Sequence, residues 1–298
     1  MTPCPRRRLV IVSGLTTLLT LSACKQPDAP PNVGPGQLAF ASDRLGQFDI
    51  YLMNANGTEV QRLTDQLAFD FWPSWSPDGT ALAFTSDRDS DPGRQTLHIY
   101  VMNADGTGVA RVTADTAQDD EPAWSSDGTE LAFRSDRDGN DEIYVVNVDG
   151  SGLVRLTSDP AADVQPAWAP DGSRIAFVTD RDGNPEIYVM NPDGTGLTNL
   201  SGNAASDLGP AWSPDGTRLV FHSNRDGGFA IYVMNADGSS VVRLTNLTAP
   251  SELAAWSPDG SRIAFDSDGE IYVMQADGTH LARVTATDAA NYIPRWRP

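Results

Sequence analysis

The chain contains little cysteine and few basic residues. Its 298 residues include two cysteines, Cys4 and Cys24, and 21 basic residues against 40 acidic ones, which gives a net charge of −19. This balance argues against nucleic acid as a partner, because phosphate neutralisation needs clustered lysine and arginine. The same charge opposes adhesion of the folded domain to anionic lipid.

The sequence also lacks the short motifs of common hydrolases and metal centres. It contains no G-x-S-x-G and no H-E-x-x-H, the patterns of a nucleophile elbow and of a zinc protease. The three histidines, His98, His222 and His280, occupy non-equivalent places in the repeat described below, which argues against a shared histidine site. We therefore predict a protein that is not an enzyme and that holds no cofactor or metal.

The N-terminal apolar run is too short to span a bilayer comfortably. It extends from Leu9 to Leu21, follows three arginines and ends in Leu-Ser-Ala-Cys at 21–24, which resembles the lipobox of bacterial lipoproteins. The resemblance implies that residues 1–23 are a signal peptide and that Cys24 carries a diacylglycerol. An ordinary secretory signal with an incidental cysteine is the alternative. In such lipoproteins Lys25, in place of an aspartate, implies the outer membrane, facing the periplasm.

Processing at this site would leave one domain joined to the membrane by a tether. Residues 24–36 carry four prolines, and a proline-rich segment acts as a semi-rigid spacer. The processed chain has 40 acidic and 18 basic residues, a net charge of −22. Its one cysteine is the lipidated one, so we expect no disulfide. Residues 37–298 are long enough for one large domain with a sizeable core.

The stretch 121–157 contains four short apolar runs separated by Asp-Gly pairs. The runs are 122–124, 131–133, 143–146 and 153–156. Asp-Gly is a strong hairpin signal, because glycine accepts a positive φ without steric cost. The runs are rich in β-branched and aromatic residues and are too short for helices. The unit is therefore predicted to be a four-stranded antiparallel meander, with strands A to D in chain order.

This unit recurs along the chain. Strand A ends in tryptophan in six units, most of them 44 residues apart: Trp75, Trp124, Trp168, Trp212, Trp256 and Trp296. Such a period with four strands per repeat is typical of a β-propeller, and a solenoid is the alternative. The first unit lacks strand A, whereas residues 292–296 supply a lone strand A. We predict an all-β, six-bladed propeller of four-stranded antiparallel blades, closed by pairing the C-terminal strand with the N-terminal strands.

The two faces of such a propeller differ in sequence. The A–B and C–D hairpins lie on one face, here called the hairpin face, and repeat S-P-D-G and N-x-D/N-G. We interpret these repeats as turn chemistry and the strand A tryptophans as packing between blades. The B–C loops and D–A crossings lie on the other face, here called the mouth face. This face varies from unit to unit, as a recognition surface would.

The D–A crossings place an acid five residues before the tryptophan in four units. Strand A is normally innermost in a propeller, so these acids should ring the mouth of the central channel. With aromatic and polar neighbours they form the predicted binding surface, which consists of Asp70, Phe71, Trp72, Asp119, Asp120, Glu121, Asp163, Gln165, Asp207 and Tyr292. In one interpretation this acidic, partly aromatic rim receives a basic or polar partner. In the other, the carboxylates hold the crossings in shape through hydrogen bonds to loop backbone.

The B–C loops repeat S/T-D/N-R-D-G or a relative of it in five units, whereas the sixth loop, Asp268-Gly269, lacks the arginine and is four residues shorter. Pairs of Asp and Arg that join one blade to its neighbour are the favoured explanation. Calcium is an alternative, suggested by the alternating oxygen ligands Asp136, Asp138, Asn140 and Glu142. An EF-hand loop, however, needs glutamate at its twelfth position, where this chain has Asn147.

The string WSPDGTRLVFHSNRDGGFAIYVMNADG, residues 212–238, resembles the propeller repeats of the TolB family. The resemblance covers residues 38–296, where Trp, SPDG, L-A-F, S-D-R-D-G, I-Y-V-M-N and R-L-T recur in register. It implies a periplasmic six-bladed propeller. TolB itself has a separate N-terminal α/β domain and binds the peptidoglycan-associated lipoprotein in the Tol–Pal envelope system. This chain is expected to lack that domain and to be lipidated, so the resemblance implies the fold and leaves the Tol role open.

These observations lead to one functional hypothesis and one alternative. The hypothesis is a monomeric, lipid-anchored envelope protein that acts as a protein-interaction scaffold through the acidic channel mouth. Its partner would be an envelope protein, with a peptidoglycan-associated protein as one candidate, and the lipid anchor would contact the membrane. The alternative is a glycan-binding or glycan-cleaving propeller, in which a carboxylate pair such as Asp119 and Asp163 does acid–base chemistry.

Overall fold

The computed structural model describes residues 36–90, 95–114 and 116–298, and it confirms the predicted all-β propeller. Twenty-four strands form six four-stranded antiparallel sheets. The predicted signal peptide, the predicted lipidation site Cys24 and the predicted tether up to residue 35 lie outside the described residues. In the part of the chain that is described, no helix is long and apolar enough to cross a membrane.

Each sheet is one blade. Blade 1 consists of β24 (Asn291–Trp296), β1 (Gln37–Ser42), β2 (Asp49–Asn54) and β3 (Gln61–Arg62), and blade 2 of β4 (Asp70–Trp75), β5 (Ala81–Ser86), β6 (His98–Asn103) and β7 (Ala110–Arg111). Blade 3 consists of β8 (Asp119–Trp124), β9 (Glu130–Ser135), β10 (Glu142–Asn147) and β11 (Val154–Arg155), and blade 4 of β12 (Asp163–Trp168), β13 (Ile175–Thr179), β14 (Glu186–Met190) and β15 (Thr198–Asn199). Blade 5 consists of β16 (Asp207–Trp212), β17 (Arg218–Ser223), β18 (Ala230–Asn235) and β19 (Val242–Arg243), and blade 6 of β20 (Ser251–Trp256), β21 (Arg262–Ser267), β22 (Glu270–Gln275) and β23 (Ala282–Arg283).

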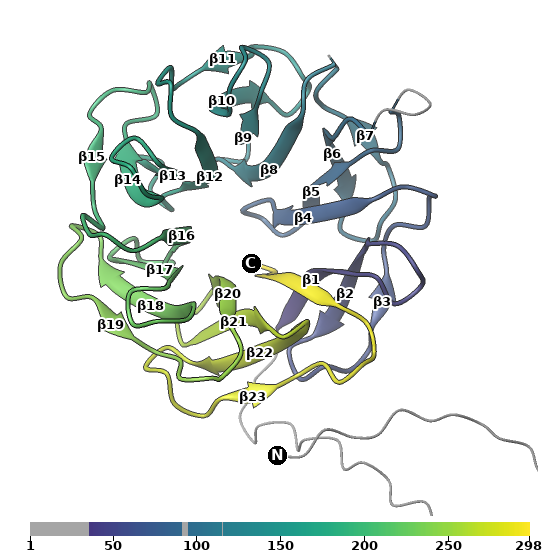
Figure 1. Ribbon diagram of the computed structural model, residues 1–298. Coiled ribbons are helices and arrows are strands. Elements are labelled where there is room, and N and C mark those ends of the chain that lie inside the picture. The colour runs from purple at the N-terminus through teal and green to yellow at the C-terminus, as the bar shows by residue number, and fades with distance from the viewer. Residues whose placement is uncertain (1–35, 91–94, 115) are drawn as a thin grey trace, which may run out of the picture.

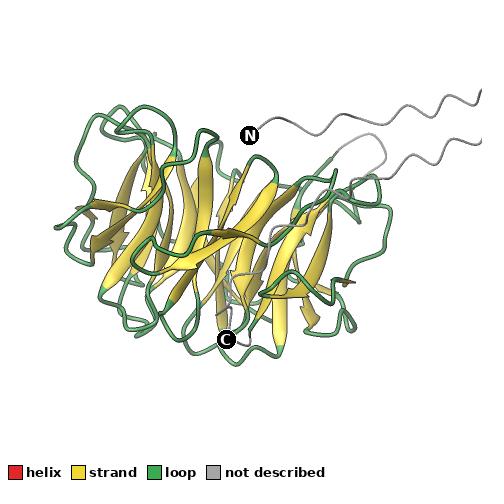
Figure 2. Cartoon of the chain, turned by 90° about the horizontal axis from the view of Figure 1, so that it is seen from below, coloured by secondary structure: helices red, strands yellow, loops and turns green. Residues whose placement is uncertain are grey.

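The strand that follows each D–A crossing is the innermost strand of its blade. Figure 1 shows β4, β8, β12, β16, β20 and β24 around the central channel, with β3, β7, β11, β15, β19 and β23 at the rim. The ring closes as predicted, because β24 pairs antiparallel with β1, with Leu38 opposite Trp296. Seen from the side, the ring is a disc whose two faces are made of loops and turns (Figure 2).

The core lies between neighbouring blades. Each apolar cluster joins the strands of one blade to those of the next, as where Ile187 and Val189 of blade 4 pack with Phe221 and Tyr232 of blade 5. The strand A tryptophans belong to this packing. The Trp212 indole N–H donates to the carbonyl oxygen of Ala167 in the preceding blade at 3.1 Å. The interpretation of these tryptophans as inter-blade contacts is confirmed.

The hairpin face follows the turn chemistry that its sequence predicts. In the β16–β17 turn, Asp215 accepts hydrogen bonds from the Ser213 hydroxyl, the Thr217 hydroxyl and the Thr217 backbone N–H. Gly216 completes the turn with a φ of 68°, in the left-handed region that glycine enters without steric cost. Asp78, Asp127 and Asp259 accept the same set of bonds in their own turns.

Candidate functional site

The four acids predicted to ring the channel mouth are buried in ion pairs. Their side chains are fully buried, and each accepts a guanidinium N–H from the B–C loop of its own blade at 2.8–3.0 Å. The pairs are Asp70 with Arg88, Asp119 with Arg137, Asp163 with Arg181 and Asp207 with Arg225. In blade 1 Asn291 takes the place of the acid and accepts from Arg44 at 2.9 Å.

These pairs lie within a blade, which corrects the expectation that they would join one blade to its neighbour. Each arginine also donates to a serine or threonine at the end of strand B. Its guanidinium lies 4.5–5.7 Å from the ring centroids of a Phe and a Tyr in the same blade. The arginine therefore fastens the B–C loop to strand A by charge, hydrogen bonds and cation–π contact.

Blade 6 lacks this fastening. Its short B–C loop has no arginine, and Ser251 replaces the acid of strand A. Tyr272 is half-buried, whereas the equivalent tyrosines of the other five blades are buried. The shorter loop leaves room for a pocket on the mouth face, lined by residues that include Glu252, Asp266 and Tyr292.

The third residue of each innermost strand has a positive φ. We call these residues the bulge ring; they are Trp72, Glu121, Gln165, Gly209, Leu253 and Ile293, with φ between 50° and 62°. The pairing register with strand B shifts at this point in every blade. Five of the six are not glycine, so the left-handed conformation is maintained against its local cost by the surrounding ring.

Side chains that face the channel satisfy the backbone N–H groups of the bulge ring. The Gln165 N–H donates to the Glu121 carboxylate at 2.6 Å, and the Gly209 N–H donates to the Gln165 side-chain carbonyl at 2.8 Å. The Leu253 N–H donates to His222 Nδ1 at 3.3 Å. Each acceptor belongs to the preceding blade, so the ring is linked from blade to blade around blades 3 to 6.

Asp266 continues this pattern to the closing blade, because its carboxylate accepts the Ile293 N–H at 3.1 Å. Sequence reasoning missed His222 and Asp266 as channel residues. Both stand on strand B between the Phe of the L-A-F run and a serine. Neighbouring side chains on a strand point to opposite faces of the sheet. A polar residue directly after the buried Phe is therefore the sequence signal that could have identified them.

Burial dominates the electrostatics of these channel residues. It raises the pKa of the Asp266 carboxyl to about 7 and lowers the pKa of His222 to about 3, because both charged forms lose solvation. Burial also raises the pKa of Asp120 and of Glu121, and the Asp120 charge raises that of Glu121 further. Arg134 partly offsets this, with Nη1 lying 3.6 Å from the Asp120 carboxylate.

An aromatic cluster covers one side of the mouth face, where blades 1 and 2 meet. Phe71 lies 5.1 Å from Phe48, 6.0 Å from Trp72 and 6.4 Å from Tyr292, measured between ring centroids. These four side chains are half-buried. Three of them were predicted as binding residues, and the structure brings those three together. Sequence reasoning missed Phe48, from the B–C loop of blade 1, and Phe69, whose ring centroid lies 5.2 Å from that of Phe71.

The oxygen ligands considered for calcium are engaged within the protein. The Asp138 carboxylate pairs with Arg155 at 3.0 Å and accepts the Tyr144 hydroxyl, and Glu142 pairs with Arg155 at 2.7 Å. Among the described residues, no three His, Cys, Asp or Glu side chains are grouped to hold a metal ion. These contacts join the B–C loop of blade 3 to β10 and β11.

Comparisons with known proteins agree with this architecture. A family model described as the TolB beta propeller domain matches residues 21–93, 93–162, 137–208 and 199–298. The protein TolB homolog of Chlorobium luteolum is 40% identical over 57 residues, which are 19% of this chain and 13% of that protein. The Tol-Pal system protein TolB of Desulfosudis oleivorans is 32% identical over 74 residues, 25% of this chain and 17% of that protein.

The crystal structure of TolB from Acinetobacter baumannii is similar in fold. It matches with a TM-score of 0.75 at 19% sequence identity, over 88% of this chain and 67% of that chain. The sequence matches thus cover 13% and 17% of the two curated relatives. The structural match covers 67% of the TolB chain. At this identity the structural match establishes the fold alone.

Proposed function

The chain belongs to the TolB β-propeller domain family, and from this membership we propose that it is an exported, lipid-anchored envelope protein that acts as a protein-interaction scaffold. Its contact surface is the mouth face of the propeller. Its partner is an envelope protein that presents basic and apolar side chains. The proposal rests on the mouth face because equivalent positions differ there from blade to blade, whereas on the hairpin face they repeat.

One observation carries the choice of surface. The mouth face combines the half-buried aromatic cluster around Phe71 with carboxylates such as Glu252 that have no cation within ion-pair distance among the described residues. Aromatic side chains provide the buried anchors of many interfaces, and a surface of one charge steers a partner of the opposite charge.

In this proposal the predicted binding residues have two roles. Asp70, Asp119, Asp163 and Asp207 position the B–C loops through their buried arginine pairs. Phe71, Trp72, Asp120, Glu121, Gln165 and Tyr292 supply the surface that a partner contacts. Carboxylates that are already neutralised by a guanidinium contribute little charge to a partner, so the first group adds little to the acidic character of the mouth.

Binding is favoured over catalysis for the same reason. The alternative of a glycan-cleaving propeller relied on a pair such as Asp119 and Asp163 acting as acid and base. Both side chains are fully buried and paired with arginine, so neither of these two carboxylates is free to act on a substrate. A glycan-binding role for the mouth face is an outcome that the following experiment would reveal.

Photo-crosslinking in intact cells tests the contact surface. A photoreactive phenylalanine analogue replaces Trp72 on the mouth face, and a matched probe replaces Leu153, an exposed residue of the β10–β11 turn on the hairpin face. We expect one discrete protein adduct from position 72 and none from position 153. Equal labelling from both positions, or none from either, would contradict the proposal. An adduct to glycan from position 72 would favour the alternative.

The lipid anchor is tested separately. Cells fed a fatty acid with an alkyne group are expected to label the wild-type protein and to leave the Cys24→Ala variant unlabelled, with the variant released from the membrane fraction. A Cys4→Ala variant serves as the control and is expected to behave as wild type. A Cys24→Ala protein that remains labelled would disprove the anchor and would leave the mouth-face proposal intact.

A further inference from the structure

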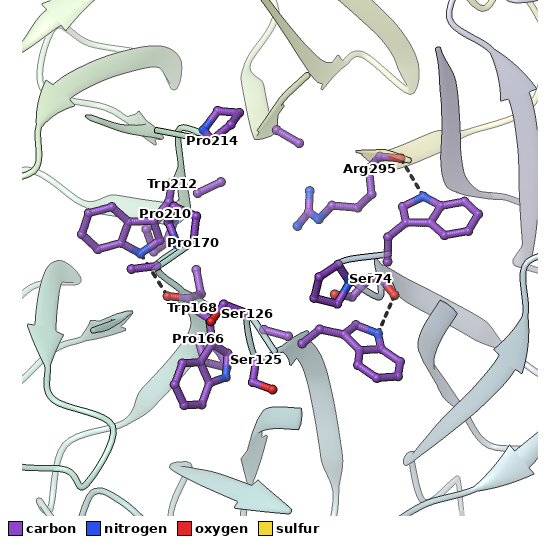
Figure 3. A pocket seen from close by; sticks show the side chains of 18 of the residues that line it. Ser74, Ser125, Ser126, Pro166, Trp168, Pro170, Pro210, Trp212, Pro214 and Arg295 are labelled. Atoms are coloured by element: carbon purple, nitrogen blue, oxygen red, sulfur yellow. Dashed lines mark hydrogen bonds between the residues drawn. The ribbon is translucent and has the colours of Figure 1, made fainter. Parts of the chain in front are cut away.

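The hairpin-face end of the central channel holds a cavity of about 340 Å³. It is lined by the tryptophans and prolines of the innermost strands and by prolines of the A–B turns, including Pro77, Pro170 and Pro214 (Figure 3). Of the described residues that line it, Arg295 alone is charged. A protein with 40 acidic residues therefore has, at this end of its channel, a cavity with one cation and no acid.

Arg295 replaces a small residue of the repeat. It is the second-to-last residue of β24 and faces Ala39 on β1. The same place in the other five innermost strands is occupied by Ser74, Ala123, Ala167, Ala211 and Ala255. The five small residues leave the channel open, and the arginine projects from β24 into that space (Figure 3).

The guanidinium of Arg295 has no counter-ion at contact distance among the described residues. Its Nη1 donates to the carbonyl oxygens of Leu253 at 3.4 Å and of Pro294 at 3.2 Å. Asp266 acts on it electrostatically without reaching ion-pair distance. Burial lowers the pKa of Arg295 to about 10, so the group keeps its charge at neutral pH. Its Nε and Nη2 have no hydrogen-bond partner among the described residues, and in a guanidinium these two atoms offer the parallel N–H pair that binds a carboxylate through both oxygens.

Ser74 adds a second polar group beside the guanidinium. It stands on β4, the innermost strand of the neighbouring blade, and lies on the same side of the cavity as Arg295 (Figure 3). The two strands are in contact, because the Trp75 indole N–H donates to the Arg295 carbonyl oxygen at 3.2 Å. Apart from three further serines, Ser125, Ser126 and Ser213, the lining consists of proline, tryptophan and alanine side chains, against which a short apolar body can pack.

We propose that this cavity is a carboxylate-binding site, in which Arg295 holds the carboxylate of a ligand whose apolar body lies against the proline and tryptophan ring. The carboxylate is either the C-terminus of a peptide entering from the hairpin face or that of a free small organic acid. The site lies at the opposite end of the channel from the mouth-face surface. It is therefore independent of the proposed scaffold function.

Isothermal titration calorimetry with three probes tests this assignment. The probes are an N-acetylated alanine dipeptide with a free C-terminal carboxylate, the same dipeptide as its C-terminal amide, and butyrate. The proteins are the wild type, Arg295→Ala and Arg295→Lys. Alanine already stands at this place in four other blades, so Arg295→Ala is expected to fold. Arg243→Ala, on the outer strand β19, removes the same charge far from the channel and is the matched control.

We expect at least one carboxylate probe to bind wild type and Arg243→Ala equally, and to lose about tenfold or more in affinity with Arg295→Ala. Arg295→Lys should bind more weakly than wild type, because lysine lacks the planar pair of donors. Binding of the dipeptide acid without butyrate identifies a peptide C-terminus, and comparable binding of both identifies a free acid. Equal binding of acid and amide would overturn the proposal. So would unchanged affinity in Arg295→Ala, or the absence of saturable binding by either acid up to about 10 mM.

Discussion

Acids at the hairpin end and at the mouth end of the blades have opposite character. At the hairpin end, hydrogen bonds from Ser213 and Thr217 lower the pKa of Asp215 to about 2, and the residue is exposed. At the mouth end, burial raises the pKa of Asp266 to about 7. A carboxylate in a turn gains hydrogen-bond donors and remains hydrated, which lowers its pKa. A carboxylate inside the channel loses its hydration, and this loss raises its pKa by more than its hydrogen bond lowers it.

This difference shows where the repeat is constrained. Every hairpin turn requires the same acceptor and the same glycine, because the turn geometry is the same in each blade. The channel end requires only that each bulge-ring N–H finds an acceptor. Glu121, Gln165, His222 and Asp266 meet that need with different chemistry. The mouth face is therefore free to vary while the fold is preserved.

The largest expected effect is the loss of an inter-blade tryptophan at the hairpin end. Trp212 is 8% exposed, donates to Ala167 and lies under the Arg174 guanidinium, which is 4.7 Å from its ring. Trp212→Ala should lower the free energy of unfolding by about 3–5 kcal/mol, through lost packing and a residual cavity. Chemical denaturation followed by circular dichroism measures the change.

The matched variant for this comparison is Trp72→Ala at the mouth end. Trp72 is half-buried, so its removal should cost less than about 1.5 kcal/mol. Equal losses in the two variants would show that the mouth aromatics are part of the core. That outcome would remove the contrast between the two ends.

An intermediate effect is expected from breaking a buried ion pair at the mouth. Asp70→Ala leaves the Arg88 guanidinium, which is 12% exposed, without its carboxylate, and should cost about 3 kcal/mol. Asp70→Asn should cost about 1 kcal/mol, because Asn291 serves as the acceptor for Arg44 in blade 1. Thermal unfolding of both variants checks the order. An asparagine variant as unstable as the alanine variant would show that charge, and not the acceptor, fastens the loop.

The smallest effect is a change in pH dependence at the channel. The pKa of Asp266 rises from 3.8 to about 7 on folding, so between these values the folded state binds more protons than the unfolded state. The stability that this residue contributes is therefore greatest at low pH and falls as the pH rises through about 7. Asp266→Asn keeps an acceptor for the Ile293 N–H and should be relatively more stable at pH 8 than at pH 4, by about 1–2 kcal/mol.

Asp215→Asn on the hairpin face gives the opposite sign and serves as the control. The pKa of Asp215 is lowered to about 2, so its contribution is present at neutral pH and is lost as the pH falls toward 2. Because the residue is exposed, the loss at neutral pH should stay below about 1 kcal/mol. Denaturation midpoints of both variants across this pH range measure the two slopes. Parallel slopes would contradict the contrast between the faces.

Local patterns predicted much of this protein and missed its channel chemistry. The tryptophan spacing and the Asp-Gly pairs predicted the blades, and the lone strand at 292–296 predicted the closure. Asp70 and its equivalents were predicted to lie in the D–A crossings, and in the structure they are the first residues of the innermost strands. Their burial beneath arginine could not be read from spacing, because Asp70 and Arg88 are 18 residues apart and meet only when strands A and B pair.

The sequence by itself determined the number of blades, the turns and the inter-blade tryptophans, because each depends on contacts that recur with the repeat. The tertiary structure decided which acids are neutralised, which N–H groups His222 and Asp266 satisfy, and that no acid among the described residues reaches ion-pair distance of Arg295. Those properties arise between residues of different blades or of distant strands. Closure of the ring brings such residues together. It also excludes the water that would otherwise solvate and screen all of their charges to a similar extent.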